Sequence, residues 1–265
     1  MENGTKYALI TGGTAGIGFE LAKLFAKDKY NLILVSRDQQ NLDNASQQLK
    51  QEGIDVITIS KDLFNRDEAF ALCQEIKDLG IVVDVLVNDA GQGVYGLFKD
   101  NDIERELKII DLNIASLTIL TKHFLNEMIA RNDGKILNLA SIASETPGPW
   151  QAVYHGTKAY VLSITEAIRE EVKDTNITIT ALLPGPTATD FFNKAGMQDS
   201  RILQKESMIS DPADVAKDGY KALMSGDDKI TSGFQNKIMV GMSHITPDTM
   251  VAHNMNEMQK PVDEE

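Results

Sequence analysis

Short runs of apolar residues alternate with longer amphipathic stretches along most of the chain. The apolar runs are typical of strands and cover residues 7–10, 31–36, 55–60, 84–88, 134–140 and 177–183. The stretches between them repeat apolar residues every three or four positions, which predicts helices over residues 16–27, 38–52, 65–79, 103–131 and 150–173. This alternation predicts parallel strands joined by helical crossovers.

The predicted strands are apolar along their whole length rather than at every second position. Leu32-Ile33-Leu34-Val35 is one example and Val85-Leu86-Val87 is another. Strands of this kind are buried on both faces, as in a parallel sheet covered by helices. With right-handed crossovers, the pattern predicts a single α/β domain with a doubly wound parallel sheet.

The end of the chain is less regular. Residues 187–210 are polar with weak periodicity, which predicts a loop that covers a substrate site. Asp211 and Pro212 are typical of a helix start. Residues 229–240 are expected to carry the last strand of a domain that covers residues 1–245. Residues 246–265 show no clear period, and we interpret them as a C-terminal tail.

Charge and length narrow the function classes. The 265 residues are 42% apolar, which is enough for a sizeable core, and the net charge is −13. An acidic surface disfavours binding to nucleic acid or to anionic membranes. The single cysteine, Cys73, lies on a predicted buried helix face and favours a reducing compartment. With no targeting segment and no apolar stretch long enough to span a bilayer, we expect a cytoplasmic protein.

A glycine-rich segment directly follows the first predicted strand and opens the first helix. Gly12, Gly16 and Gly18 allow a tight turn and a close approach of the backbone to a pyrophosphate. The helix N-terminus then offers free N–H groups to the phosphates. The spacing reads T-G-x-x-x-G-x-G, which differs from both G-x-G-x-x-G and the P-loop.

This segment resembles the cofactor loop of short-chain dehydrogenases/reductases, and further motifs follow in that family's order. They are Asn88-Asp89-Ala90-Gly91, Asn113, Ser141 after the fifth strand, Tyr154-x-x-x-Lys158, and Pro184-Gly185-Pro186-Thr187 with Thr189. The resemblance covers residues 7–189 and implies a Rossmann-type sheet of about seven strands with helices on both faces. It implies a nicotinamide cofactor held by Gly12, Thr14, Gly16, Ile17, Gly18, Ser36, Arg37, Asp62, Asn88, Ala90, Gly91, Tyr154, Lys158, Pro184, Gly185, Thr187 and Thr189.

The spacing of Tyr154 and Lys158 is informative in itself. Residues four apart in a helix share one face. A free tyrosine, with a pKa of about 10, is a poor base at neutral pH, and a nearby ammonium lowers that pKa. Tyr154 thereby becomes a usable acid/base for a carbonyl or alcohol oxygen.

The resemblance implies roles for the other catalytic candidates. Ser141 orients the substrate oxygen and is favoured by its position over the nearby Ser144. Asn113 bends its helix locally and holds a water that relays protons to Lys158. Lys158 also holds the nicotinamide ribose. The implied reaction is hydride transfer from NADPH to a carbonyl carbon while Tyr154 donates the proton, or the reverse oxidation of an alcohol.

The end of the second strand bears on the choice of cofactor. Ser36 and Arg37 occupy the place where NAD enzymes usually carry an acidic residue, and a guanidinium suits a 2′-phosphate. Asp38 lies at a plausible distance to bind a ribose hydroxyl instead, but we interpret it as the N-cap of the next helix. We therefore expect NADP(H) to be preferred, with NAD(H) possible.

One motif departs from the family's pattern, and the sequence indicates only a broad class of substrate. Asp89 replaces the family's usual second Asn, so an acceptor stands where an amide could also donate. We expect the substrate pocket to be lined by Trp150, residues 145–147, residues 94–95 and the 187–210 loop. These mixed residues favour a small ketone, aldehyde or hydroxyl compound.

Other readings are weaker. The histidines His123, His155, His244 and His253 are scattered, which indicates no metal site, and no G-x-S-x-G elbow points to a hydrolase. An alternative interpretation is a sensor or scaffold on the same fold that binds NADP without turnover. Such a protein need not retain Asn113, Ser141, Tyr154 and Lys158, so the presence of all four disfavours this alternative. Epimerases and dehydratases of related fold need a larger C-terminal domain. By analogy with the family, we expect a homodimer or homotetramer.

Overall fold

The structure is a computed structural model that describes residues 6–204 and 206–263. Its described strands form one parallel sheet of seven strands in the order β3-β2-β1-β4-β5-β6-β7. They are β1 (Tyr7–Thr11), β2 (Asn31–Ser36), β3 (Val56–Ser60), β4 (Val85–Asn88), β5 (Gly134–Leu139), β6 (Ile177–Leu183) and β7 (Lys229–Thr231). The strand order reverses between β1 and β4, where doubly wound sheets bind their ligands.

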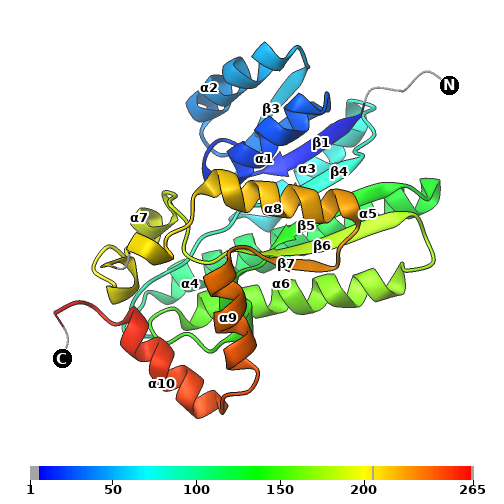
Figure 1. Cartoon of the computed structure of the whole chain (residues 1–265). Coiled ribbons are helices and arrows are strands. Elements are labelled where there is room, and N and C mark those ends of the chain that lie inside the picture. Colours follow the sequence, from blue (N-terminus) through cyan, green and yellow to red (C-terminus); the bar gives the residue numbers. More distant parts are fainter. Residues whose placement is uncertain (1–5, 205, 264–265) are drawn as a thin grey trace.

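Helices cover both faces of this sheet, as the sequence predicted (Figure 1). They are α1 (Gly16–Lys27), α2 (Gln39–Leu49), α3 (Arg66–Asp78), α4 (Ile103–Ile110), α5 (Leu117–Arg131), α6 (Ala152–Glu171), α7 (Phe191–Ala195), α8 (Pro212–Ser225), α9 (Phe234–Ser243) and α10 (Asp248–Gln259). One core cluster joins the sheet to α1, α2 and α8, and a second joins it to α3 and α5. None of the described helices is long and apolar enough to cross a membrane.

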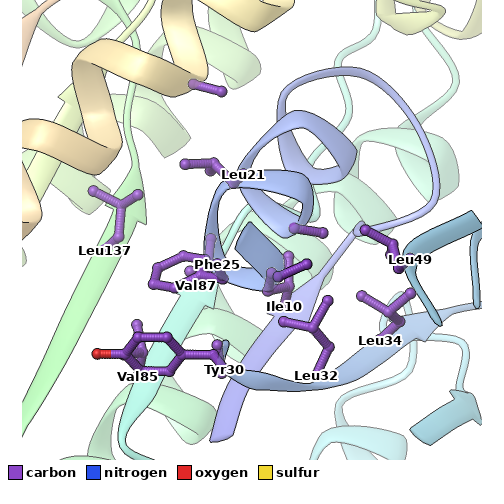
Figure 2. Packing of buried hydrophobic residues seen from close by; sticks show 14 of the residues in the cluster. Ile10, Leu21, Phe25, Tyr30, Leu32, Leu34, Leu49, Val85, Val87 and Leu137 are labelled. Atoms are coloured by element: carbon purple, nitrogen blue, oxygen red, sulfur yellow. The ribbon is translucent and has the colours of Figure 1, made fainter. Parts of the chain in front are cut away.

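The first cluster fixes the helix that carries the glycine loop. Figure 2 shows Leu21 and Phe25 of α1 in one cluster with Ile10 of β1 and Leu32 of β2. All four side chains have no exposed surface. Burial of each such side chain contributes about 1.5–3 kcal/mol, so this packing holds the N-terminus of α1 firmly at the end of β1.

A chain of buried polar side chains crosses the middle of the sheet. The amide nitrogen of Asn88 donates to Thr121 on α5 and to the amide oxygen of Asn138 on β5, both at 2.9 Å. Asn138 in turn donates to Thr165 on α6 at 3.0 Å. These bonds fix the register of β4 against β5 and anchor α5 and α6 to the same strands.

The long helix predicted over residues 103–131 contains a wider turn. A π-helical segment, Asp111–Ser116, separates α4 from α5. Such segments are often found at functional sites. Asn113 lies inside this segment, so the local distortion expected there is present.

The C-terminal part holds more structure than its pattern indicated. The last strand ends at Thr231, and α9 begins three residues later. Within residues 246–265, α10 forms a helix whose buried residues include Val251 and Met255. Two of its partners, Trp150 and Tyr95, lie more than a hundred residues earlier, and a local search for periodicity does not detect such contacts.

Candidate active site

A cavity of about 310 Å³ opens where the carboxyl ends of the central strands meet α7, α9 and α10. Most of the predicted site residues line it: Gly12, Thr14, Gly16, Ile17, Ser36, Arg37, Ala90, Gly91, Ser141, Tyr154, Lys158, Pro184, Gly185, Thr187 and Thr189. Gly18, Asp62, Asn88 and Asn113 lie outside this lining. One cavity therefore combines the glycine loop with the catalytic candidates.

The glycine loop has the geometry that a dinucleotide requires. Gly12 and Gly16 adopt φ angles of 73° and 57°, which residues with a Cβ rarely adopt. A Cβ on Gly16 would lie 2.9 Å from the side chain of Thr189. Ala15, at the N-cap of α1, provides no side-chain cap. No side chain caps the N–H groups of Gly16 and Ile17 at the start of the first turn, so they can bind phosphate oxygens, and the loop fits the cofactor.

The end of β2 presents a cation at the expected place. The Arg37 guanidinium stacks on the Phe64 ring at 4.7 Å, and its Nε lies 3.9 Å from a carboxylate oxygen of Asp62. Asp38 caps α2 by accepting from the N–H of Asn41 at 2.8 Å, as its predicted N-cap role requires. The carboxylate is therefore used by the helix, and Arg37 is the residue that faces the cavity.

Tyr154 and Lys158 project from α6 into the same part of the cavity. The Lys158 ammonium donates to the carbonyl of Leu139 at 2.7 Å and lies 5.9 Å from the centre of the Tyr154 ring. The Tyr154 hydroxyl forms a hydrogen bond with Ser141. Three of the four predicted catalytic side chains thus meet at the end of β5.

The pKa of Tyr154 differs from the sequence-based expectation. Burial raises the pKa of Tyr154 to about 12, and the hydrogen bond from Ser141 offsets only part of this effect. Burial also lowers the pKa of Lys158 to about 8, against a smaller opposing effect of the Asp89 carboxylate. Desolvation dominates both groups, so the pKa of Tyr154 lies above its ordinary value, whereas the sequence predicted a lowered one.

The two serines after β5 have different surroundings. Ser144 donates to the carbonyl of Lys158 at 2.8 Å and accepts from the N–H of Ser141 at 3.2 Å. Ser144 therefore supports the backbone. Ser141 accepts from the N–H of Ala143 at 3.1 Å, and its side chain lines the cavity. The geometry favours Ser141 as the serine that meets a substrate.

Asn113 braces the loop after β4. Its amide donates to the carbonyl of Gln92 at 2.9 Å and accepts from the N–H of the same residue at 3.1 Å. It also donates to the Thr157 hydroxyl at 3.0 Å. The π-helical turn thus connects α6 to the loop that contains Gly91.

Asp89 lies beneath the glycine loop. It accepts a hydrogen bond from the backbone N–H of Gly18, and its Oδ2 is 2.8 Å from where a Cβ on Gly12 would lie. Burial raises the pKa of Asp89 to about 7, although the Lys158 ammonium and the Gly18 bond oppose this rise.

The substrate end of the cavity differs from the prediction. Trp150 and Tyr95 stack on each other at 5.7 Å and bond to α10 through Asn256 and the carbonyl of Gln259. They therefore support α10 and do not line the cavity. Of residues 145–147, only Thr146 reaches it.

The sequence missed several residues that line this end. They are Gln151, His155, Met255 and Gln259, whereas Phe191, Phe192 and Ile202 belong to the 187–210 loop that was expected to line the pocket. The Thr146 carbonyl can only accept, so the bond of 2.8 Å to His155 places a proton on Nδ1. His155 Nε2 then accepts from Gln259 at 3.1 Å. No local pattern points to this pair, because 104 residues separate its members.

Comparison with known proteins agrees with this geometry. The family model described as short chain dehydrogenase matches residues 6–200. The uncharacterized oxidoreductase YvrD of Bacillus subtilis is 36% identical over 185 residues, which are 70% of this chain and 70% of that protein. The ketoacyl reductase HetN of a Nostoc strain is 30% identical over 254 residues, covering 92% of this chain and 86% of that protein.

A solved structure shares the fold over nearly the whole chain. The short-chain dehydrogenase from Sphingobium yanoikuyae in complex with NADPH has a TM-score of 0.80 at 23% identity, over 94% of this chain and 99% of that one. The parallel sheet, the cavity at its carboxyl edge and the family match all lead to one conclusion. The chain belongs to the short-chain dehydrogenase family and is an NAD(P)-dependent oxidoreductase that acts on CH–OH groups.

Proposed function

We propose that this protein is an NADP(H)-dependent oxidoreductase that interconverts a small carbonyl compound and its alcohol, with Tyr154 as the acid/base. The observation that carries the proposal is the meeting of Tyr154, Ser141 and Lys158 in the cavity that begins at the glycine loop. A general acid must stand within hydrogen-bond reach of the oxygen it protonates, and this cavity provides that place.

The chain's own residues would bind the substrate oxygen and supply its proton. Bound NADPH provides the hydride. Ser141 and Tyr154 present two hydroxyl groups to the same oxygen. Because its pKa lies near 12, Tyr154 keeps its proton at neutral pH and can donate it, which favours carbonyl reduction. The Lys158 ammonium, at 5.9 Å from the ring, would stabilise the phenolate that forms.

Arg37 supports the preference for NADP(H). Its guanidinium lines the cavity beside Ser36, and stacking on Phe64 holds it there. A planar guanidinium can bind a 2′-phosphate through two parallel hydrogen bonds. The capping role of Asp38 removes the nearest acidic competitor for the ribose hydroxyls.

The cavity supports a substrate of modest size. Its substrate end combines the Phe191 and Phe192 rings with the amides of Gln151 and Gln259, which suits a largely apolar ketone or aldehyde with few polar groups.

We also propose a cytoplasmic location, which the single buried thiol of Cys73 supports. A homodimer or homotetramer is supported by Ile103 and Leu107, which α4 leaves 57% and 45% exposed.

The decisive experiment measures NADPH oxidation by the purified protein with a panel of ketones, aldehydes and diketones. NADH is run in parallel, and Tyr154→Phe serves as the catalytic control. We expect turnover that prefers NADPH and falls about 1,000-fold or more in the variant, while NADPH still binds. Equal turnover in Tyr154→Phe would contradict the assignment. Tight NADPH binding without turnover on any compound would favour the alternative of a non-catalytic NADP-binding sensor. The relatives named as reductases and oxidoreductases do not support that alternative.

A further inference from the structure

Asp89 places a carboxylate at the N-terminus of the helix that is expected to face the cofactor's pyrophosphate. Its side chain is partly buried beneath the loop formed by Gly12 and Gly18, and the residue lines the cavity. The N–H of Gly18 belongs to the first turn of α1 and donates to this carboxylate. One of the free donors at this helix end is therefore already used by an anion.

The surroundings of Asp89 provide little compensation for a full negative charge. On the side of α1 and β1 it meets backbone groups of Gly12 and Gly18. Its own N–H bonds to the hydroxyl of Thr11. The charged group that acts on it from α6 is Lys158, whose ammonium is directed to the carbonyl of Leu139. A partly buried carboxylate with one hydrogen bond and no direct ion pair among the described residues is protonated more readily than a carboxylate in water.

A bound pyrophosphate would add two further negative charges to the same helix N-terminus. Like charges in a water-excluded site repel strongly, and the cheapest relief is to neutralise the group that can accept a proton. The protonated carboxyl regains a hydrogen-bond donor, which matches the donor capacity of the Asn that the family usually carries at this position. Neutral Asp89 is thus the form that fits the complex.

We propose that Asp89 is a cofactor-affinity residue that takes up one proton from solvent when NADP(H) binds. The carboxylate becomes a carboxylic acid, and no other bond forms or breaks. Affinity is then highest when Asp89 is already protonated in the free protein. It decreases as the pH rises through the pKa of about 7 toward the higher pKa of the complex. This inference rests on the proposal that the glycine loop binds a nicotinamide dinucleotide.

The test is isothermal titration of NADPH into the full-length protein between pH 7 and pH 9.5, which lies above the titration of the 2′-phosphate. At pH 8, measurements in phosphate and in Tris separate the heat of binding from the heat of buffer ionisation and give the number of protons taken up. For the wild type, we expect proton uptake and a Kd that weakens about tenfold across this range, since each unit of pKa shift corresponds to a factor of ten.

Two variants assign the proton. Asp89→Asn and Asp89→Ser lack the carboxylate. In either variant, the Kd for NADPH should change less than twofold between pH 7 and pH 9.5, and binding should take up no proton. Equal pH dependence in the wild type and both Asp89 variants would overturn the role of Asp89. Absence of NADPH binding at every pH would instead overturn the cofactor proposal, and this inference with it.

Discussion

The two ends of the cavity are built in different ways. At the cofactor end, the glycine loop is made by a short segment, because Gly12, Gly16 and the first turn of α1 are adjacent in the chain. The substrate end is made by distant segments, where Trp150 contacts Asn256 across 106 positions and Tyr95 contacts Gln259 across 164. Cofactor binding therefore depends on local backbone geometry, whereas substrate selection depends on the docking of α10.

The strongest test of the local end is Gly18→Ala. A Cβ there would lie 2.4 Å from Asp89 Oδ2 and 2.6 Å from the carbonyl oxygen of Gly12, so the loop must shift. We expect the Kd for NADPH, measured by fluorescence, to weaken about 100-fold or more, because phosphate binding needs well-placed N–H groups. The matched control is Gly156→Ala, where no atom lies within 4 Å of the added Cβ. Equal affinities in the two variants would refute the role of the loop.

The docking of α10 is tested by Asn256→Leu. This change leaves the buried indole N–H of Trp150 without its partner, which costs about 1–3 kcal/mol. We expect a lower Tm and an increase in KM for the carbonyl substrate of about tenfold, while the Kd for NADPH stays the same. Asn254→Leu changes an exposed residue of the same helix and serves as the control. A weakened Kd for NADPH in Asn256→Leu would show that the two ends are not separable.

Arg37→Ala sharpens the comparison at the cofactor end. Removing the guanidinium should reduce kcat/KM for NADPH about tenfold and leave NADH almost unaffected, since charge-assisted hydrogen bonds contribute about 1.5–3 kcal/mol. Steady-state kinetics with both cofactors give the ratio of kcat/KM for NADPH to kcat/KM for NADH. An unchanged ratio would mean that another group, such as Lys61 on the cavity wall, binds the 2′-phosphate.

The smallest expected effect concerns pH and the substrate end. Burial lowers the pKa of His155 below its ordinary value of 6.5, so the unfolded chain binds a proton more readily than the folded one. Stability should then be fully present above pH 6.5 and decrease as the pH falls below it. We expect the wild type to lose more Tm between pH 7.5 and pH 5.5 than His155→Gln. His253→Gln, on the exposed side of α10, should follow the wild type.

The sequence predicted the parts that short motifs encode. Gly12, Gly16 and Gly18 indicated the turn, and the spacing of Tyr154 and Lys158 indicated one helix face. The apolar runs predicted the strands closely, since burial on both faces leaves a continuous pattern. Asp38 was assigned correctly as a cap because its role is local.

What the sequence did not predict depends on distant contacts or on burial. α10 has a mixed, Met-containing pattern, and its partners Tyr95 and Trp150 were expected to line the cavity. His155 and Gln259 come together only after folding. The raised pKa of Tyr154 depends on how completely the ring is desolvated, which spacing alone does not reveal.

The chain of amides across the sheet restricts how this protein can change under selection. Asn88, Asn138, Thr121 and Thr165 each bond to another member of the group. Replacing one of them by an apolar residue leaves a neighbour buried without its partner, at about 1–3 kcal/mol, whereas replacing both partners of a bond together is nearly neutral. In laboratory evolution, single substitutions at these positions should therefore be rejected, whereas paired substitutions of both hydrogen-bond partners should be accepted. The centre of the sheet would then drift more slowly than its apolar surroundings.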